Sequence, residues 1–150
     1  MKIAIDLNVL LDVAQNRTAF YQESEEVIAR AREGECEGVI SGHLVTTFHY
    51  LVAKFAGVAA ANIAVDGLLT DFAVVGADKE LLCEARKLPM KDFEDSVVAA
   101  TADSYGCDYI VTRNTPDFSG SPIPAISPAD FLKRFPSPAS GEATDGYIGA

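Results

Sequence analysis

The chain has 150 residues, 49% of them hydrophobic, and a formal net charge of −10. This length and composition suit one domain with a single core, and no apolar run reaches the roughly eighteen residues of a membrane span. The acidic balance argues against a domain that grips nucleic acid mainly through a basic surface, but it allows a nuclease whose positive charge comes from a bound divalent cation.

The apolar pattern predicts strands that alternate with helices. Strands are expected at residues 3–5, 37–41, 71–78, 108–112 and 123–127, and helices at 7–17, 19–34, 42–57, 58–69, 79–88, 95–106 and 128–135. Asp78 is a predicted helix cap. The alternation predicts a three-layer α/β fold, in which helices flank a central, mostly parallel sheet.

The two ends of the sequence carry different expectations. The start, MKIAID, runs directly into an apolar strand and lacks the features of a signal peptide, so we expect a soluble, cytoplasmic protein. Residues 1–135 form the predicted domain. Residues 136–150, rich in Pro, Gly, Ser and Ala, are expected to be a flexible tail.

Several carboxylates fall where the predicted elements meet. Asp6 ends the first strand, Asn114 and Asp117 follow the strand at 108–112, and Asp92 and Asp95 stand at the start of a helix. In an open α/β sheet, ligands bind beyond the carboxyl ends of the strands. Asp6, Asp95 and Asp117 can therefore meet at one edge and offer the oxygen ligands that a hard divalent cation prefers.

Each of these residues also has a purely structural interpretation. Asp95 alone is more simply explained as a helix cap, and "NTPD" at 114–117 is ordinary turn chemistry. Asp6 follows an apolar strand, where an unpaired carboxylate would be costly. We expect Asp12 to be a solvated helix residue and Asp108 to start a strand at the opposite end of the sheet.

Two stretches carry a resemblance to a known family. "AIDLNVLLDV" resembles the opening of PIN-domain nucleases, and "DFEDSVVAATADSYGCDYIVTRNTPDF" is similar to the second half of that fold in the VapC-like toxins of toxin–antitoxin pairs. The resemblance covers roughly residues 1–133. It implies a PIN-like fold and a metal-dependent ribonuclease that uses Mg²⁺ or Mn²⁺.

The same resemblance implies roles for individual residues. Asp6, Asp95 and Asp117 match the metal-binding acids of the family, and Asn114 matches a catalytic position that is often acidic. Supporting positions are Asp92, Thr112, Arg113 and Thr47. Many relatives carry a Glu at the position of Thr47, so the chain departs from the family there. His43, one turn before Thr47 on the same helical face, is a weaker candidate ligand, and His49 is expected to be structural.

The expected reaction is hydrolysis of RNA phosphodiester bonds at this metal site. Arg17 and Arg113 could each meet a substrate phosphate or could each be solvated. The resemblance also implies a small antitoxin partner and a homodimer.

Two other interpretations remain. Thr47 and the acidic surface favour a catalytically weak or inactive PIN-like binding module. A phosphoryl-transfer enzyme or receiver is less well supported, because the first strand ends in D-L-N, no Lys follows a late strand, and no P-loop is present.

Overall fold

The computed structural model describes residues 1–138 of the chain, so most of the tail predicted at 136–150 lies outside the described residues. Its strands are β1 (Lys2–Ile5), β2 (Glu37–Ser41), β3 (Ala73–Val75), β4 (Tyr109–Val111) and β5 (Ala125–Ile126). Its helices are α1 (Leu7–Ala14), α2 (Tyr21–Arg32), α3 (Gly42–Ala56), α4 (Val58–Asp71), α5 (Lys79–Lys87), α6 (Phe93–Tyr105), the short 3₁₀ helix η1 (Thr115–Phe118) and α7 (Pro128–Arg134).

All the strands join one sheet in the order β3-β2-β1-β4-β5, and every pair of neighbours is parallel. In the centre, Ile3 of β1 pairs with Gly38 of β2 on one side and with Tyr109 of β4 on the other. The central strands are buried, as expected for a parallel sheet covered on both faces. The predicted α/β fold is confirmed, with a sheet that is parallel throughout.

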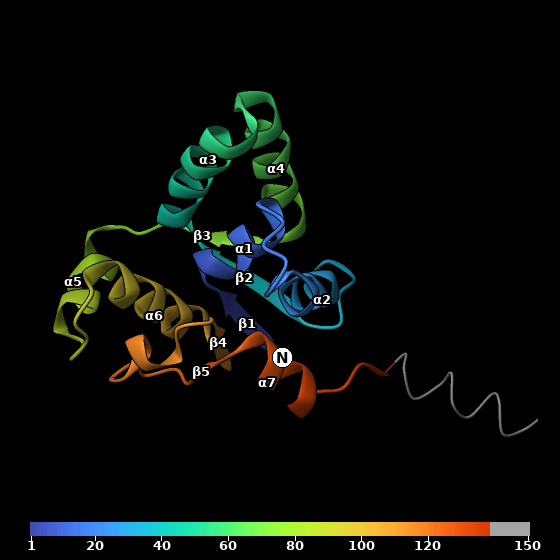
Figure 1. The fold of residues 1–150 in the computed structure, drawn as a ribbon. Helices are drawn as coiled ribbons and strands as arrows, with labels where there is room; N and C mark the ends of the chain where they lie inside the picture. Colours follow the sequence, from blue (N-terminus) through green and yellow to red (C-terminus); the bar gives the residue numbers. More distant parts are fainter. Residues whose placement is uncertain (139–150) are drawn as a thin grey trace, which may run out of the picture.

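Helices form a layer on each face of the sheet (Figure 1). One layer holds α5 and α6, and α6 contacts β1, β2 and β4. Its buried side includes Ala99 and Ala102, whose small side chains let the helix approach the strands closely. The other layer holds α1, α2 and α7, while α3 and α4 form a hairpin that rises from the β3 side of the sheet.

The main core fills the space between the sheet and these layers, with Ile3, Val39, Ile40 and Ile110 fully buried. Asp78 caps α5 as predicted, because its side chain accepts a hydrogen bond from the backbone N–H of Leu81. Within the described residues, no helix is long and apolar enough to cross a membrane.

Candidate active site

The candidate site lies at the carboxyl edge of the sheet, where β2, β1 and β4 are neighbours. Asp6 directly follows β1, Ser41 ends β2, and Thr112 directly follows β4. The backbone N–H of Asp6 donates to the carbonyl of Val111 at 3.0 Å, so the ends of β1 and β4 are held together. The parallel topology therefore brings side chains that are more than a hundred residues apart into contact.

Asp6 is the best-fixed carboxylate of this edge. Only 7% of the residue is exposed, and its oxygens accept hydrogen bonds from the backbone of Leu7 (2.9 Å), the Asn8 amide (3.2 Å) and the Thr112 hydroxyl (2.8 Å). Burial raises the pKa of Asp6, while the bonds from Thr112 and Leu7 oppose that shift. These donors explain how the chain tolerates a carboxylate directly after a buried strand.

Helix α6 carries Asp92 and Asp95, and only one of them is a cap. Asp92 is the N-cap, since its side chain accepts a hydrogen bond from the backbone N–H of Asp95 at 3.0 Å. The structural interpretation of Asp95 as the cap was therefore wrong, and its carboxylate does not cap the start of the helix. Asp92, expected as a supporting residue, orients the first turn on which Asp95 stands.

Asp95 has the most strongly perturbed carboxylate at this edge. Burial is the largest cause, followed by the negative charges of Asp6, Asp92, Asp117 and Glu94, and together they raise the pKa of Asp95 to about 7. Asp6, Asp95 and Asp117 come from remote parts of the sequence, so this mutual repulsion is the electrostatic sign that the fold gathers them. A carboxylate with such a shift is a functional-site candidate.

The segment after β4 supplies Asn114 and Asp117. Thr112 is fully buried and accepts a hydrogen bond from the backbone N–H of Asn114 at 3.1 Å, which links this segment to Asp6. Asp117 lies in η1, and its N–H donates to the carbonyl of Asn114 at 3.0 Å. A cavity of about 550 Å³ is lined by Pro89, Lys91, Asp92, Asp95, Pro116, Asp117 and Ser119. Asp6 and Asn114 stand outside that lining.

The sequence implies a divalent cation at this edge, and the side chains gathered here are carboxylates, which such a cation prefers. Burial, and then the charges of the neighbouring carboxylates, raise the pKa of Asp95 to about 7, and such a crowded group of oxygens matches the preference of a hard cation. Nevertheless, within residues 1–138 no three His, Cys, Asp or Glu side chains form a ready group for holding a metal. The chemistry of the donors fits Mg²⁺ or Mn²⁺, whereas their side-chain positions do not yet form a closed coordination shell.

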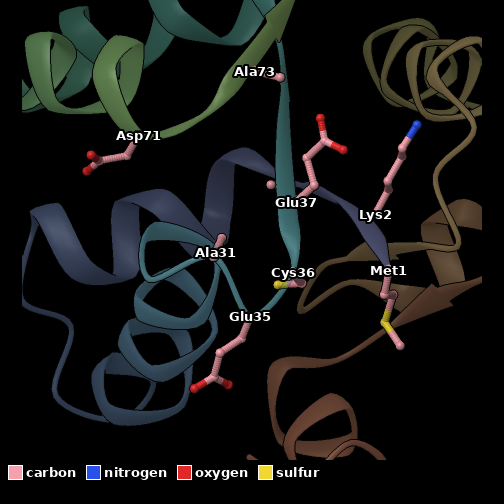
Figure 2. A pocket seen from close by; sticks show the side chains of 10 residues that line it. Met1, Lys2, Ala31, Glu35, Cys36, Glu37, Asp71 and Ala73 are labelled. Carbon is pink, nitrogen blue, oxygen red and sulfur yellow. The ribbon is translucent and has the colours of Figure 1, made fainter.

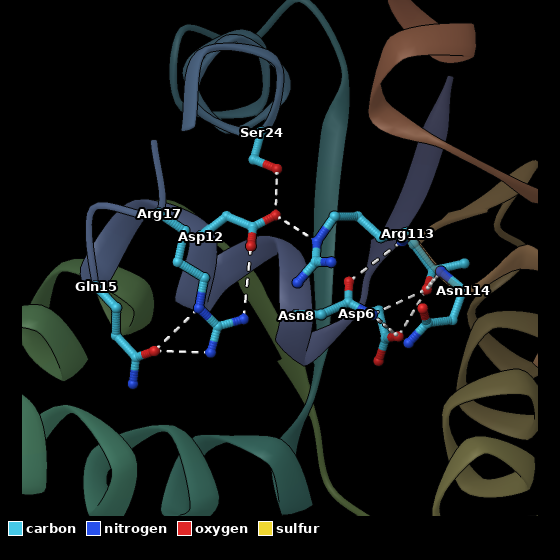
Figure 3. Close-up of polar contacts among 9 residues, drawn as sticks. Asp6, Asn8, Asp12, Gln15, Arg17, Ser24, Arg113 and Asn114 are labelled. Atoms are coloured by element: carbon cyan, nitrogen blue, oxygen red, sulfur yellow. Dashed lines mark hydrogen bonds and ion pairs between the residues drawn. The ribbon is translucent and has the colours of Figure 1, made fainter. Parts of the chain in front are cut away.

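Asp12 is a buried ion-pair partner, which contradicts the expectation of a solvated residue (Figure 3). It has 0% exposure, and its Oδ2 accepts hydrogen bonds from Arg113 Nε and from the Ser24 hydroxyl, both at 2.8 Å. Arg17 Nη1 lies 3.6 Å from the other carboxylate oxygen. The guanidinium of Arg113 also sits 4.0 Å above the ring of Phe20. Both arginines proposed as phosphate contacts thus point to Asp12.

Asn8 is a site residue that the sequence analysis missed. Its amide nitrogen donates to Asp6 and to Thr112 Oγ1 (3.3 Å), and its Oδ1 accepts from the backbone N–H of Arg113 (3.3 Å). It therefore ties the start of α1 to the segment after β4 (Figure 3). The signal was present as the polar residue two positions after Asp6 in "DLN".

Helix α3 carries His43 and, one turn later, Thr47, and the charge of Asp6 acts on His43. Thr47 is half-buried, and no hydrogen bond joins its side chain to the rest of the described chain. His43 Nδ1 lies 2.7 Å from Ser41 Oγ, which in turn lies 3.1 Å from Thr101 Oγ1. Burial lowers the pKa of His43, and the negative charges of Glu94 and Asp6 oppose that shift. His49 instead contacts Asn62 at 2.8 Å, as expected of a structural residue.

A second pocket lies at the opposite end of the sheet (Figure 2). Its volume is about 440 Å³, and it is lined at the starts of β1 and β2 by residues that include Lys2, Glu35 and Glu37. At this end Asp108 accepts a hydrogen bond from the backbone N–H of Lys2 at 2.9 Å, as its expected position predicted. The polarity of the strands therefore separates this pocket from the carboxylates of the candidate site.

Comparisons with known proteins agree with this architecture. A family model described as "PIN domain" matches residues 2–116. The fold is similar to DNA-bound VapBC from Salmonella typhimurium (18% identity, TM-score 0.66, covering 85% of this chain and 98% of that chain). It is also similar to a toxin–antitoxin complex from Klebsiella pneumoniae, with 18% identity and a TM-score of 0.63 over 84% of this chain and 97% of that chain. A third similar structure is VapC20 from Mycobacterium tuberculosis, described as a sarcin–ricin loop cleaving toxin, with 17% identity and a TM-score of 0.65 over 81% of this chain and 95% of that chain. The comparison with curated proteins finds no match.

Proposed function

This chain belongs to the PIN-domain family, whose model covers residues 2–116, and we propose that it is a metal-dependent ribonuclease that hydrolyses RNA phosphodiester bonds. The observation that supports the proposal is the grouping of acids around Asp95, whose pKa is raised to about 7 by burial and by the charges of Asp6, Asp92, Asp117 and Glu94. Carboxylates gathered in this way repel one another, and a divalent cation would supply the compensating positive charge.

The proposed ligands have different surroundings and therefore different roles. Asp6 is held rigidly by Asn8 and Thr112, so it fixes one edge of the site. Asp95 and Asp117 line the open cavity and can adjust to an incoming ligand. Asp6, Asp95 and Asp117 would hold Mg²⁺ or Mn²⁺, with Asn114 as a neutral neighbour. When bound, the ion would lower the pKa of a water molecule and neutralise charge on the phosphate.

The proposal includes a biological setting for the enzyme. We place the chain as the toxin of a toxin–antitoxin pair, with a small antitoxin protein as its partner, an RNA as its substrate and a homodimer as its assembly. The fold similarity to the toxin–antitoxin complex supports the role as a toxin and the antitoxin partner. The acidic cavity would suit a basic antitoxin segment.

A PIN-like binding module is the second candidate function. Thr47 replaces an expected acidic ligand, and within the described residues no three ligating side chains form a ready metal group. A module of this kind would bind Mg²⁺ or Mn²⁺ poorly and would dock a basic partner in its acidic cavity.

Cleavage of a mixed RNA pool distinguishes the two functions. Purified chain is incubated with Mn²⁺ or Mg²⁺ beside an EDTA control, Asp95→Asn and the matched variant Asp103→Asn, an exposed aspartate on the same helix. The ribonuclease proposal expects cleavage by the wild type and Asp103→Asn, and none with EDTA or Asp95→Asn. Folded wild type that leaves the RNA intact would put the binding module first.

A further inference from the structure

All 12 lysines and arginines of this acidic protein lie within the described residues, so the contacts of every positive side chain are known. Each arginine contacts a carboxylate or an aromatic ring there, and so do Lys2, Lys54 and Lys87. In the described part of the chain, ion pairs and ring contacts are lacking only for Lys79, Lys91 and Lys133. These three ammonium groups are the uncommitted cations of a protein with net charge −10.

Lys91 differs from the other two by its position. It lies in the short connection between α5 and α6 and lines the cavity that also contains Asp92, Asp95 and Asp117. Lys79 stands at the start of α5, and Lys133 lies in α7, and neither lines that cavity. Lys91 is exposed and makes no ion pair with the nearby carboxylates, so its ammonium group stands at the rim and is free to meet a ligand.

The two arginines that contact Asp12 cannot take this role without losing their present partner. Arg113 Nε is bonded to fully buried Asp12, and Arg17 also lies beside that carboxylate. Turning either guanidinium toward the substrate would weaken the compensation of a buried charge, which is costly. Lys91 has no such cost, because it is exposed and no buried carboxylate of the described residues depends on its ammonium group.

We propose that Lys91 binds a backbone phosphate of the RNA strand next to the bond that is cut, which makes it a substrate-binding residue of this site. This inference rests on the ribonuclease function proposed above. An ammonium group contacts phosphates of any sequence, so Lys91 contributes affinity without base preference.

The expected effect can be stated in measurable terms. Loss of one phosphate contact should raise the KM of Lys91→Ala about five- to tenfold, with kcat nearly unchanged, because the contact is the same before and during the reaction. It should also lower the slope of log K against log salt by about 0.7 for a single-stranded RNA. Lys91→Arg should restore most of both values, since Arg also binds phosphate.

The experiment compares Lys91→Ala with the matched controls Lys79→Ala and Lys133→Ala, which remove the other uncommitted ammonium groups. Steady-state cleavage of a labelled single-stranded RNA gives kcat and KM. Anisotropy titrations over a salt series, made in an Asp95→Asn background that binds without cutting, give affinity and salt slope. Titration of Mn²⁺ should show that metal affinity does not fall in Lys91→Ala, because that change removes no oxygen ligand.

The outcomes separate the two proposals. Wild type that cleaves RNA, with Lys91→Ala matching both control variants in KM and salt slope, would overturn the role of Lys91 and leave the ribonuclease in place. A fall in kcat alone, or in metal affinity, would also overturn it. Wild type that cuts no RNA with either metal would overturn both proposals.

Discussion

Asp12 in α1 and Arg113 after β4 form an ion pair across 101 residues of sequence, with Nε and Oδ2 2.8 Å apart. The carboxylate is fully buried, while 23% of the arginine side chain is exposed. The backbone N–H of Arg113 also donates to Asn8. Helix α1, which begins directly after Asp6, therefore holds both the side chain and the backbone of the residue between Thr112 and Asn114.

Removing the charge of Asp12 should destabilise the protein. Asp12→Asn leaves Arg113 and Arg17 without their shared carboxylate, and breaking a buried pair in this way costs about 3 kcal/mol. Urea denaturation should show a lower midpoint with an unchanged slope. The control is Glu25→Gln, which breaks the exposed contact with Arg32 and should cost less than about 1 kcal/mol. Equal losses in the two variants would contradict the importance of the buried pair.

The pKa of Asp95 predicts a stability that depends on pH in the metal-free protein. The folded protein binds this proton more tightly than the unfolded chain, because the pKa rises from its ordinary 3.8 to about 7. Stability should therefore fall as pH rises from about 4 to about 7. Asp95→Asn should remove this contribution and make the metal-free protein more stable at pH 8, by about 1 kcal/mol after allowance for solvent screening.

Thermal unfolding at pH 4 and pH 8, with and without Mn²⁺, tests this prediction. Mn²⁺ should raise the unfolding temperature of the wild type more at pH 8 than at pH 4, since a protonated carboxyl is a poor ligand. Asp103→Asn on the same helix is the control and should behave as the wild type. If the unfolding temperature changed equally between pH 4 and pH 8 in Asp95→Asn and Asp103→Asn, the crowding of carboxylates around Asp95 would be disproved.

Thr47→Glu should strengthen metal binding if the cavity is a metal site. The new carboxylate would stand on α3 beside His43 and supply the acidic ligand that the chain lacks, so the Kd for Mn²⁺ should fall about tenfold. Without metal the variant should be less stable, because it adds a negative charge to an acidic edge. Thr46→Glu places the same charge on the neighbouring, exposed position of the helix and serves as the control.

Calorimetric titration of Mn²⁺ measures the change in Kd, and cleavage of single-stranded RNA measures its consequence. The ribonuclease proposal expects faster cleavage by Thr47→Glu at limiting metal and no such gain in Thr46→Glu. Tighter metal binding without any cleavage would favour the binding module. The same small change in both variants would mean that Thr47 does not face the acids proposed to bind the metal.

The sequence could predict the positions of Asp6, Asn114 and Asp117 because each follows an apolar strand, whereas Thr112 was expected only from the family resemblance. The parallel arrangement then places strand ends together. It could not predict the burial of Asp12, since the partner that compensates its charge is remote in the chain. The interpretation of Asp95 as a helix cap failed for another reason. Helix α6 starts at Phe93 and not at residue 95, and helix boundaries are the least certain part of such predictions.

The backbone at Gly120 packs closely against Pro89, which lies in the other segment that lines the cavity. It has a φ of +92°, and a Cβ atom built there would lie 2.5 Å from the carbonyl oxygen of Pro89. Pro89 and Ser119 line the cavity together with Asp92, Asp95 and Asp117, so this close backbone contact lies between the two segments that carry its carboxylates. A side chain at position 120 must strain the backbone or push the segments apart.

Gly120→Ala should therefore lower stability by roughly 1–3 kcal/mol and also weaken Mn²⁺ binding. Gly67→Ala is the matched control, because Gly67 lies within α4, where an added Cβ would meet nothing within 4 Å. That change should stabilise the protein by about 0.5–1 kcal/mol through helix propensity and leave metal binding unaltered. Urea denaturation and calorimetric titration give both quantities. A Gly120→Ala protein with wild-type stability and Mn²⁺ affinity would show that the contact with Pro89 does not hold the cavity, since either strain or separation must change one of the two.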